Sequence, residues 1–117
     1  MSTLFSPAFQ QSGCRCVYCC RDLTADFDSF MLAEEDHLIP RGYPGADDPE
    51  NIVIACRVCN GLKGQFPASE SFDANKKRDY IVSARKHIMN KRAEKMEIFA
   101  GWVCLPTNMP AKGDPND

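Results

Sequence analysis

Cys16-Val-Tyr-Cys19 and Cys56-Arg-Val-Cys59 are two copies of a Cys-x-x-Cys pattern, and 36 residues separate them in a chain of 117. One such turn presents two sulfurs from a short loop, and two turns supply the four thiolates of a tetrahedral zinc site. We therefore predict a structural zinc ion held by Cys16, Cys19, Cys56 and Cys59. A thioredoxin-like redox motif would need a single pair in a βαβ context, which is absent here.

The three remaining cysteines are Cys14, Cys20 and Cys104. Cys14 and Cys20 crowd the first pair and offer alternative pairings, but only Cys16 and Cys19 have the two-residue gap that matches the second pair. Cys104 lies far along the chain and is predicted to be a spare thiol. Disulfides fit poorly, because we expect an intracellular protein and reducing compartments keep thiols reduced.

The composition is that of one globular domain of 13.1 kDa, with 44% hydrophobic and 26% charged residues. No apolar run approaches the ~18–20 residues that span a bilayer, and the first 13 residues lack the pattern of a secretory signal. We therefore predict a cytoplasmic location and no membrane partner. The net charge of −2 is unevenly spread: residues 22–50 hold nine acids and one base, whereas residues 76–97 carry a net charge of +5.

Local patterns predict an α+β fold. Aromatic and aliphatic residues over 27–38 suggest one strand, residues 40–50 are rich in turn formers, and 52–55 is a β-branched run that suggests a second strand. A short helix is expected over 57–63, ended by Gly64. Apolar residues recur every three or four positions from Tyr80 to Phe99, which predicts an amphipathic helix with Asp73 as its N-cap and Gly101 as its stop.

Between and just after the cysteine pairs lie Asp36-His37-Leu-Ile-Pro40, then Asn51, then Asn60 directly after Cys59. Hydrolysis of a phosphodiester needs an activated water and a cation at the phosphate. His37 can accept a proton from water at neutral pH. Asp36 and Asn60 offer the hard oxygen ligands that Mg²⁺ prefers. Neighbours in a strand point to opposite faces, so Asp36 and His37 can serve one site only if the chain bends there.

The order CxxC, DHxxP, N, CxxCNxxK resembles the HNH nuclease, or ββα-metal, superfamily over roughly residues 14–64. The resemblance implies a small ββα-metal, treble-clef-like core stapled by the four-cysteine zinc site. It implies a metal-dependent endonuclease in which His37 is the general base and Asp36 and Asn60 hold the catalytic Mg²⁺ or Mn²⁺. By the same resemblance, Asn51 fixes the loop by hydrogen bonds. The family often has histidine at the position of Asn60.

DNA is the expected substrate, although the sequence does not distinguish DNA from RNA. Five basic residues are predicted to contact the nucleic acid: Lys63, Arg57, Lys76, Lys77 and Arg78. The alternative is that these are ordinary solvated surface charges. The apolar stripe of the last helix is expected to pack on the core, on a second copy in a homodimer, or on both. The alternative function is a non-enzymatic zinc-binding adaptor for nucleic acid or protein on the same scaffold.

The chain divides, on these grounds, into four segments. They are an N-terminal arm (1–13), the HNH nuclease core (14–64), a C-terminal helical extension (65–101) and a flexible, proline-rich tail (102–117). The arm reads either as mobile or as a packing extension, because its residues show no periodicity.

Overall fold

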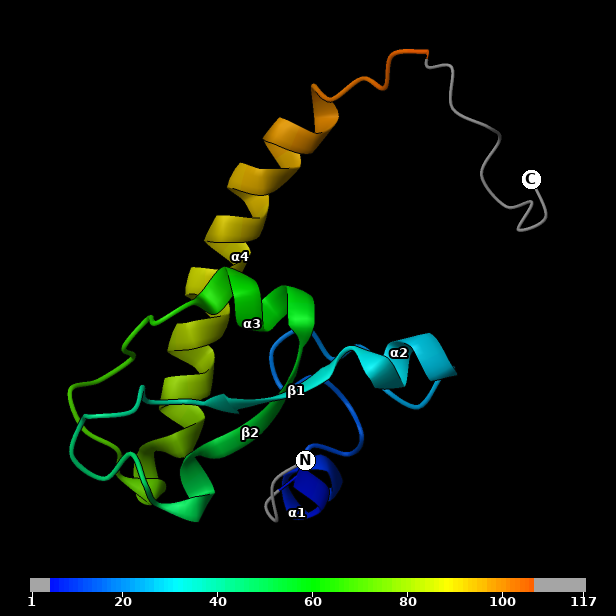
Figure 1. Ribbon diagram of the computed structural model, residues 1–117. Coiled ribbons are helices and arrows are strands. Elements are labelled where there is room, and N and C mark those ends of the chain that lie inside the picture. Colours follow the sequence, from blue (N-terminus) through cyan, green and yellow to red (C-terminus); the bar gives the residue numbers. More distant parts are fainter. Residues whose placement is uncertain (1–4, 107–117) are drawn as a thin grey trace.

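A computed structural model describes residues 5–106 of the chain. The fold is α+β, as predicted, with a long helix that leaves the body of the molecule near its C-terminal end (Figure 1). The elements in chain order are α1 (Phe5–Gln11), α2 (Phe27–Met31), β1 (Ala33–His37), η1 (Pro49–Asn51), β2 (Ile52–Cys56), α3 (Arg57–Lys63), η2 (Ala74–Lys76) and α4 (Lys77–Ala100).

The two strands form one antiparallel sheet in which Ala33 pairs with Cys56 and His37 pairs with Ile52. Every residue of β2 is buried, whereas β1 has only Asp36 buried and the rest half-exposed. Figure 1 shows α1 below the sheet and α3 above it, crossing in front of α4. β2 therefore runs through the middle of the hydrophobic core, and β1 lies at its edge, where a cleft can open.

The prediction of a strand over residues 27–38 is wrong for its N-terminal part. Residues Phe27–Met31 form the short helix α2, because the side chain of Asp26 accepts a hydrogen bond from the backbone N–H of Ser29 (2.6 Å) and so caps a helical turn. Only Ala33–His37 of that stretch is extended. The N-terminal residues also form a helix, α1, which packs as an extension on the core through Phe5, Ala8 and Phe9.

Helix α4 stops before Gly101, as expected from the sequence, but it begins at Lys77 and has no side-chain cap. Asp73, the expected N-cap, instead caps the single turn η2 that leads into α4. The apolar stripe, however, packs only in the first half, where Tyr80, Ala84 and Ile88 are buried. Later apolar side chains such as Met96 and Phe99 are 58% and 74% exposed. A homodimer through this exposed half stays a prediction.

The C-terminal tail is described only as far as Pro106, and residues 102–106 are exposed and without regular structure. The rest of the predicted tail, residues 107–117, lies outside the described part of the chain. Within residues 5–106, no helix is both long enough and apolar enough to cross a membrane.

Candidate zinc centre and active-site cleft

The four cysteines of the two Cys-x-x-Cys turns come together, as predicted. The sulfurs of Cys16, Cys19, Cys56 and Cys59 all lie within 4.8 Å of one another, and those of Cys19 and Cys56 are 3.8 Å apart. A tetrahedral site with Zn–S bonds of about 2.3 Å places its sulfurs about 3.8 Å apart. The donor set therefore fits a zinc ion, and the widest sulfur separations exceed the tetrahedral value by at most about 1 Å.

Each turn also stabilises thiolate. The backbone N–H of Cys19 points at the sulfur of Cys16 (3.5 Å), and the N–H of Cys59 points at that of Cys56 (3.4 Å). A hydrogen bond from the Cys59 thiol lowers the pKa of Cys16, and the same hydrogen bond raises the pKa of Cys59, while burial raises the pKa of Cys19. The thiol of Cys16 is therefore the one in the cluster whose surroundings favour the anion. Anionic sulfur is the form that binds zinc.

The other three cysteines lie outside this cluster. Cys14 and Cys20 take left-handed backbone conformations, with φ of 61° and 65°, at the two ends of the first turn. Cys20 and Cys104 are exposed. The alternative pairings with Cys14 or Cys20 are not found among the described residues.

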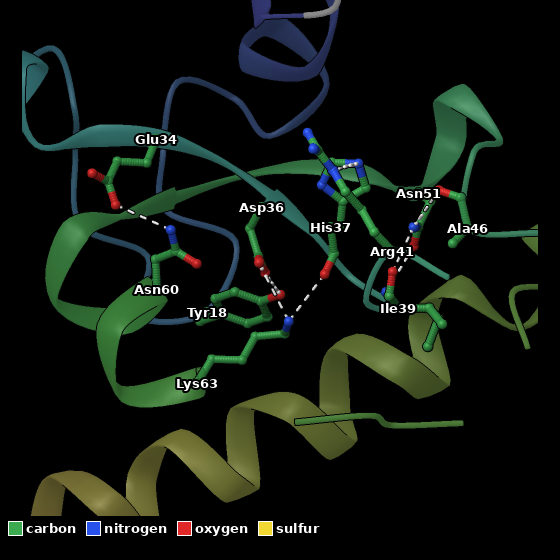
Figure 2. A network of polar contacts seen from close by, with 10 residues as sticks. All are labelled: Tyr18, Glu34, Asp36, His37, Ile39, Arg41, Ala46, Asn51, Asn60 and Lys63. Carbon is green, nitrogen blue, oxygen red and sulfur yellow. Dashed lines mark hydrogen bonds and ion pairs between the residues drawn. The ribbon is translucent and has the colours of Figure 1, made fainter. Parts of the chain in front are cut away.

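A cleft of about 490 Å³ opens beside β1, between this strand, the loop that follows it and α3. It brings together four of the residues expected from the sequence. Its lining consists of Glu35, Asp36, His37, Pro40, Arg41, Asn60, Lys63, Gly64 and Gln65. Asp36 and His37 leave the strand on opposite sides (Figure 2), yet both border this one cleft at the edge of the sheet.

The carboxylate of Asp36 is buried and bound at both oxygens. One oxygen accepts a hydrogen bond from the Tyr18 hydroxyl (2.5 Å), and the other accepts one from the Lys63 ammonium (3.3 Å). Burial raises the pKa of Asp36, while Lys63 and the Tyr18 hydrogen bond counteract that rise. A carboxylate has about four lone-pair sites, so Asp36 keeps acceptor capacity for a cation in the cleft.

Lys63 lines the cleft and is not on the outer surface, and its contact with a phosphate stays a prediction. Its side chain is 1% exposed, and its ammonium donates to Asp36 and to the backbone carbonyl of His37 (3.0 Å). Lys63 therefore joins α3 to β1 at the wall of the cleft.

His37 is half-buried, and its imidazole lies beside Arg41 (Figure 2). The Nε of Arg41 donates to Nε2 of His37 at 3.4 Å. Burial is the main reason that the pKa of His37 is lowered, and the positive charge of Arg41 adds to the effect. A neutral imidazole is the form that can take a proton from water.

Asn60 faces the cleft from the middle of α3. Its Nδ2 donates to Oε1 of Glu34 (3.0 Å), whose other oxygen accepts from Arg57 (3.1 Å). Because the amide N–H₂ is held by Glu34, the amide oxygen is turned toward Asp36, as Figure 2 shows. Arg57 itself is exposed at the outer end of this chain of contacts and does not line the cleft.

Asn51 lies behind the cleft, fully buried, and fixes the loop between the strands. Its Oδ1 accepts from the backbone N–H of Ile39, and its Nδ2 donates to the carbonyls of Ile39 and Ala46, all at 2.8 Å. Its side chain therefore holds both ends of the segment that begins with Pro40.

The three basic residues predicted at the start of α4 do not border the cleft. Lys76 and Arg78 are exposed, and Lys77 pairs with Glu50 (3.2 Å). DNA contact by these residues stays a prediction.

Sequence reasoning missed three residues around the cleft: Tyr18, Glu34 and Arg41. A signal existed for each. Tyr18 lies inside the first cysteine turn, Glu34 lies two residues before Asp36 and so shares its face of the strand, and Arg41 is the one base among residues 22–50.

Comparison with known proteins agrees with this geometry. Residues 16–66 match the family model described as HNH endonuclease, which confirms the resemblance over that segment. A stretch of 59 residues, 50% of this chain, is 37% identical to the CRISPR-associated endonuclease Cas9 of Corynebacterium diphtheriae and covers 5% of that protein's length. No solved structure matches the chain significantly.

Proposed function

We propose that the chain is a metal-dependent HNH endonuclease that hydrolyses phosphodiester bonds in DNA. The observation that carries this proposal is the cleft that Asp36, His37 and Asn60 line together. The HNH match over residues 16–66 supports the reaction class. The domain limits expected from the sequence, with a nuclease core over 14–64, are part of this proposal.

In this reading each polar side chain has one task. His37, kept neutral by its surroundings, takes a proton from the attacking water. Asp36 and Asn60 hold a divalent cation, Mg²⁺ or Mn²⁺, through a carboxylate and an amide oxygen. When bound, such a cation neutralises charge that develops at the phosphate. Glu34 orients Asn60, and Tyr18 and Lys63 orient Asp36.

The two metals have separate tasks. The four cysteines fit a structural zinc ion, because four thiolates around one ion leave no open position for a substrate. The oxygen donors of the cleft suit a harder cation. The two sites therefore differ in donor chemistry, and each suits a different class of metal ion.

One observation favours the alternative, a zinc-binding adaptor without catalysis. Both oxygens of Asp36 are already bound within the fold, to Tyr18 and Lys63. In an adaptor this buried pair would be purely structural, and the cleft would bind no divalent cation.

A plasmid-nicking assay with and without Mg²⁺ separates the two functions. The native chain should nick DNA only with the cation, and His37→Ala should slow cleavage by about 10²- to 10⁴-fold while DNA binding persists. His87 is the matched control, because it is the other histidine and stacks on Phe66 away from the cleft. Full cleavage by His37→Ala, in protein free of contaminating nuclease, would contradict the proposal.

The proposed cation ligands are best tested with substitutions that preserve the volume of the side chain. Asp36→Ala would leave Lys63 buried without its partner and lower stability as well as metal binding. Asp36→Asn keeps the volume and removes the charge, so its loss of activity should be partly rescued by excess Mn²⁺. Asn60→His should keep activity and shift the metal preference toward softer ions.

A further inference from the structure

A second hollow, of about 630 Å³, adjoins the cleft at His37 and Arg41. The two hollows share His37 and Arg41 in their walls. The second is otherwise lined by the loop from Gly42 to Asp47 and by Ile52. A chain-like ligand that occupied both hollows would therefore cross the imidazole of His37.

The loop that lines the second hollow is fixed in place. Asn51 holds the backbone on either side of it, and the carbonyl of Pro44 accepts a hydrogen bond from the N–H of Phe72 (2.8 Å). Gly45 has a φ of +80°, and a Cβ there would lie 2.5 Å from the carbonyl oxygen of Phe72. The exposed middle of the loop, with Arg41 and Tyr43, is thus a preorganised surface, which lowers the entropic cost of binding.

Arg41 has hydrogen-bond donors on this surface that the described residues leave unused. It is exposed, and the one hydrogen bond that its side chain forms within residues 5–106 is the long bond of 3.4 Å to His37. No acid within that range forms an ion pair with it. A guanidinium carries five N–H donors in a fork that matches a phosphate, and a phosphate oxygen is a stronger acceptor than a neutral imidazole.

Tyr43 offers an aromatic surface for a base beside the positive charge of Arg41. It is half-exposed and contributes an aromatic ring to the wall of the second hollow. Aromatic side chains are the platforms on which bases of an unpaired strand stack. Asp47, at the same wall, disfavours a phosphate there and can accept hydrogen bonds from a base.

We propose that Arg41 binds a backbone phosphate of the DNA strand and that Tyr43 contacts the adjoining nucleotide in the second hollow. The strand then runs across His37 from one hollow to the other. Since the phosphate draws the guanidinium away, Nε2 of His37 loses its donor and its lone pair is available to the attacking water. This inference rests on the proposed function for the identity of the ligand.

The test is binding of a fluorescein-labelled 12-nucleotide single-stranded DNA, measured by anisotropy without Mg²⁺ and without a chelator, so that zinc is retained. Arg41→Gln should weaken binding roughly ten- to a hundredfold and lower the log–log salt slope by about 0.7. Arg41→Lys should retain the slope, because it keeps the charge. Tyr43→Leu should weaken binding about fivefold or more, and Tyr43→Phe should bind like the native chain.

Arg21→Gln is the matched control, because Arg21 is exposed and lines neither hollow. Native affinity and salt slope in Arg41→Gln would overturn the inference, and so would an equal loss in Arg21→Gln. A native chain that cleaves DNA while Arg41→Gln and Tyr43→Leu keep its KM would overturn this inference alone. A native chain that binds through Arg41 but never cleaves would overturn the proposed function alone.

Discussion

Replacing Asn51 by alanine tests how the loop between the strands is held. The change leaves three backbone groups without their partner: the N–H and carbonyl of Ile39 and the carbonyl of Ala46. Each buried polar group left unpaired costs about 1–3 kcal/mol. Water can enter the space of the lost amide, so we expect a total loss near the lower end, about 3–5 kcal/mol. That is a large part of the ~5–15 kcal/mol that stabilises an ordinary domain.

Urea unfolding measures this loss directly. With a slope of about 2 kcal/mol per molar urea, the midpoint should fall by about 2 M. Asn90→Ala is the control, because Asn90 is exposed on α4 and its loss should change stability by less than about 0.5 kcal/mol. Zinc content is measured in parallel, so that metal loss is not mistaken for loss of the loop.

Asn51→Asp sharpens the test, because it keeps the size of the side chain. Its oxygen can still accept from the N–H of Ile39, but a second oxygen would face the carbonyls of Ile39 and Ala46. We expect a loss at least as large as that of the alanine variant. A native urea midpoint in both variants, together with lost cleavage, would show that Asn51 takes part in the chemistry and does not stabilise the loop.

The remaining predictions concern the metal, the base and the backbone. Cys59→Ser, or a strong chelator, should remove about one zinc per chain and unfold the protein, since structural zinc supplies on the order of 10 kcal/mol; folded, zinc-free protein by circular dichroism and metal analysis would contradict this. Because burial and Arg41 lower the pKa of His37, cleavage should be constant above about pH 6.5 and should fall below that lowered pKa, where the imidazole is protonated; a rate profile flat to pH 4 would exclude His37 as the base. Since Cys20 has a φ of 65°, Cys20→Gly should keep or slightly raise the melting temperature, whereas Cys20→Val should lose about 1 kcal/mol or more; equal melting temperatures would show that the backbone there is unstrained.

The parts of the fold that follow from local chemistry were predictable from the sequence. Each Cys-x-x-Cys turn fixes its own pair of sulfurs, and two such pairs supply the four thiolates of one zinc site, so the cluster was expected although 36 residues separate the turns. Helix α3 ends where Gly64 takes a positive φ of 56°, as its place in the sequence indicates. Helix α2 was missed because its aromatic residues suggest a strand, and the capping carboxylate of Asp26 was the stronger signal.

The contacts that shape the cleft were not predictable, because they join distant parts of the chain. Tyr18 and Asp36 are 18 residues apart, and Asp36 and Lys63 are 27 apart. Lysine is rarely buried, so a sequence pattern assigns Lys63 to the surface. Only the packing of α3 against β1 shows that the ammonium of Lys63 forms an ion pair with Asp36.

The cysteine cluster positions the cleft as well as the fold. Tyr18, which binds Asp36, lies between the two cysteines of the first turn, and Asn60 follows directly after the last cysteine of the second. A zinc ion that joins the two turns therefore fixes the separation of Tyr18 and Asn60, with the carboxylate of Asp36 held from the first turn's side. Loss of zinc should consequently disorder the proposed cation site, although no proposed ligand of that cation is altered. The spacing of the cysteines therefore also sets the spacing of the residues around the cleft.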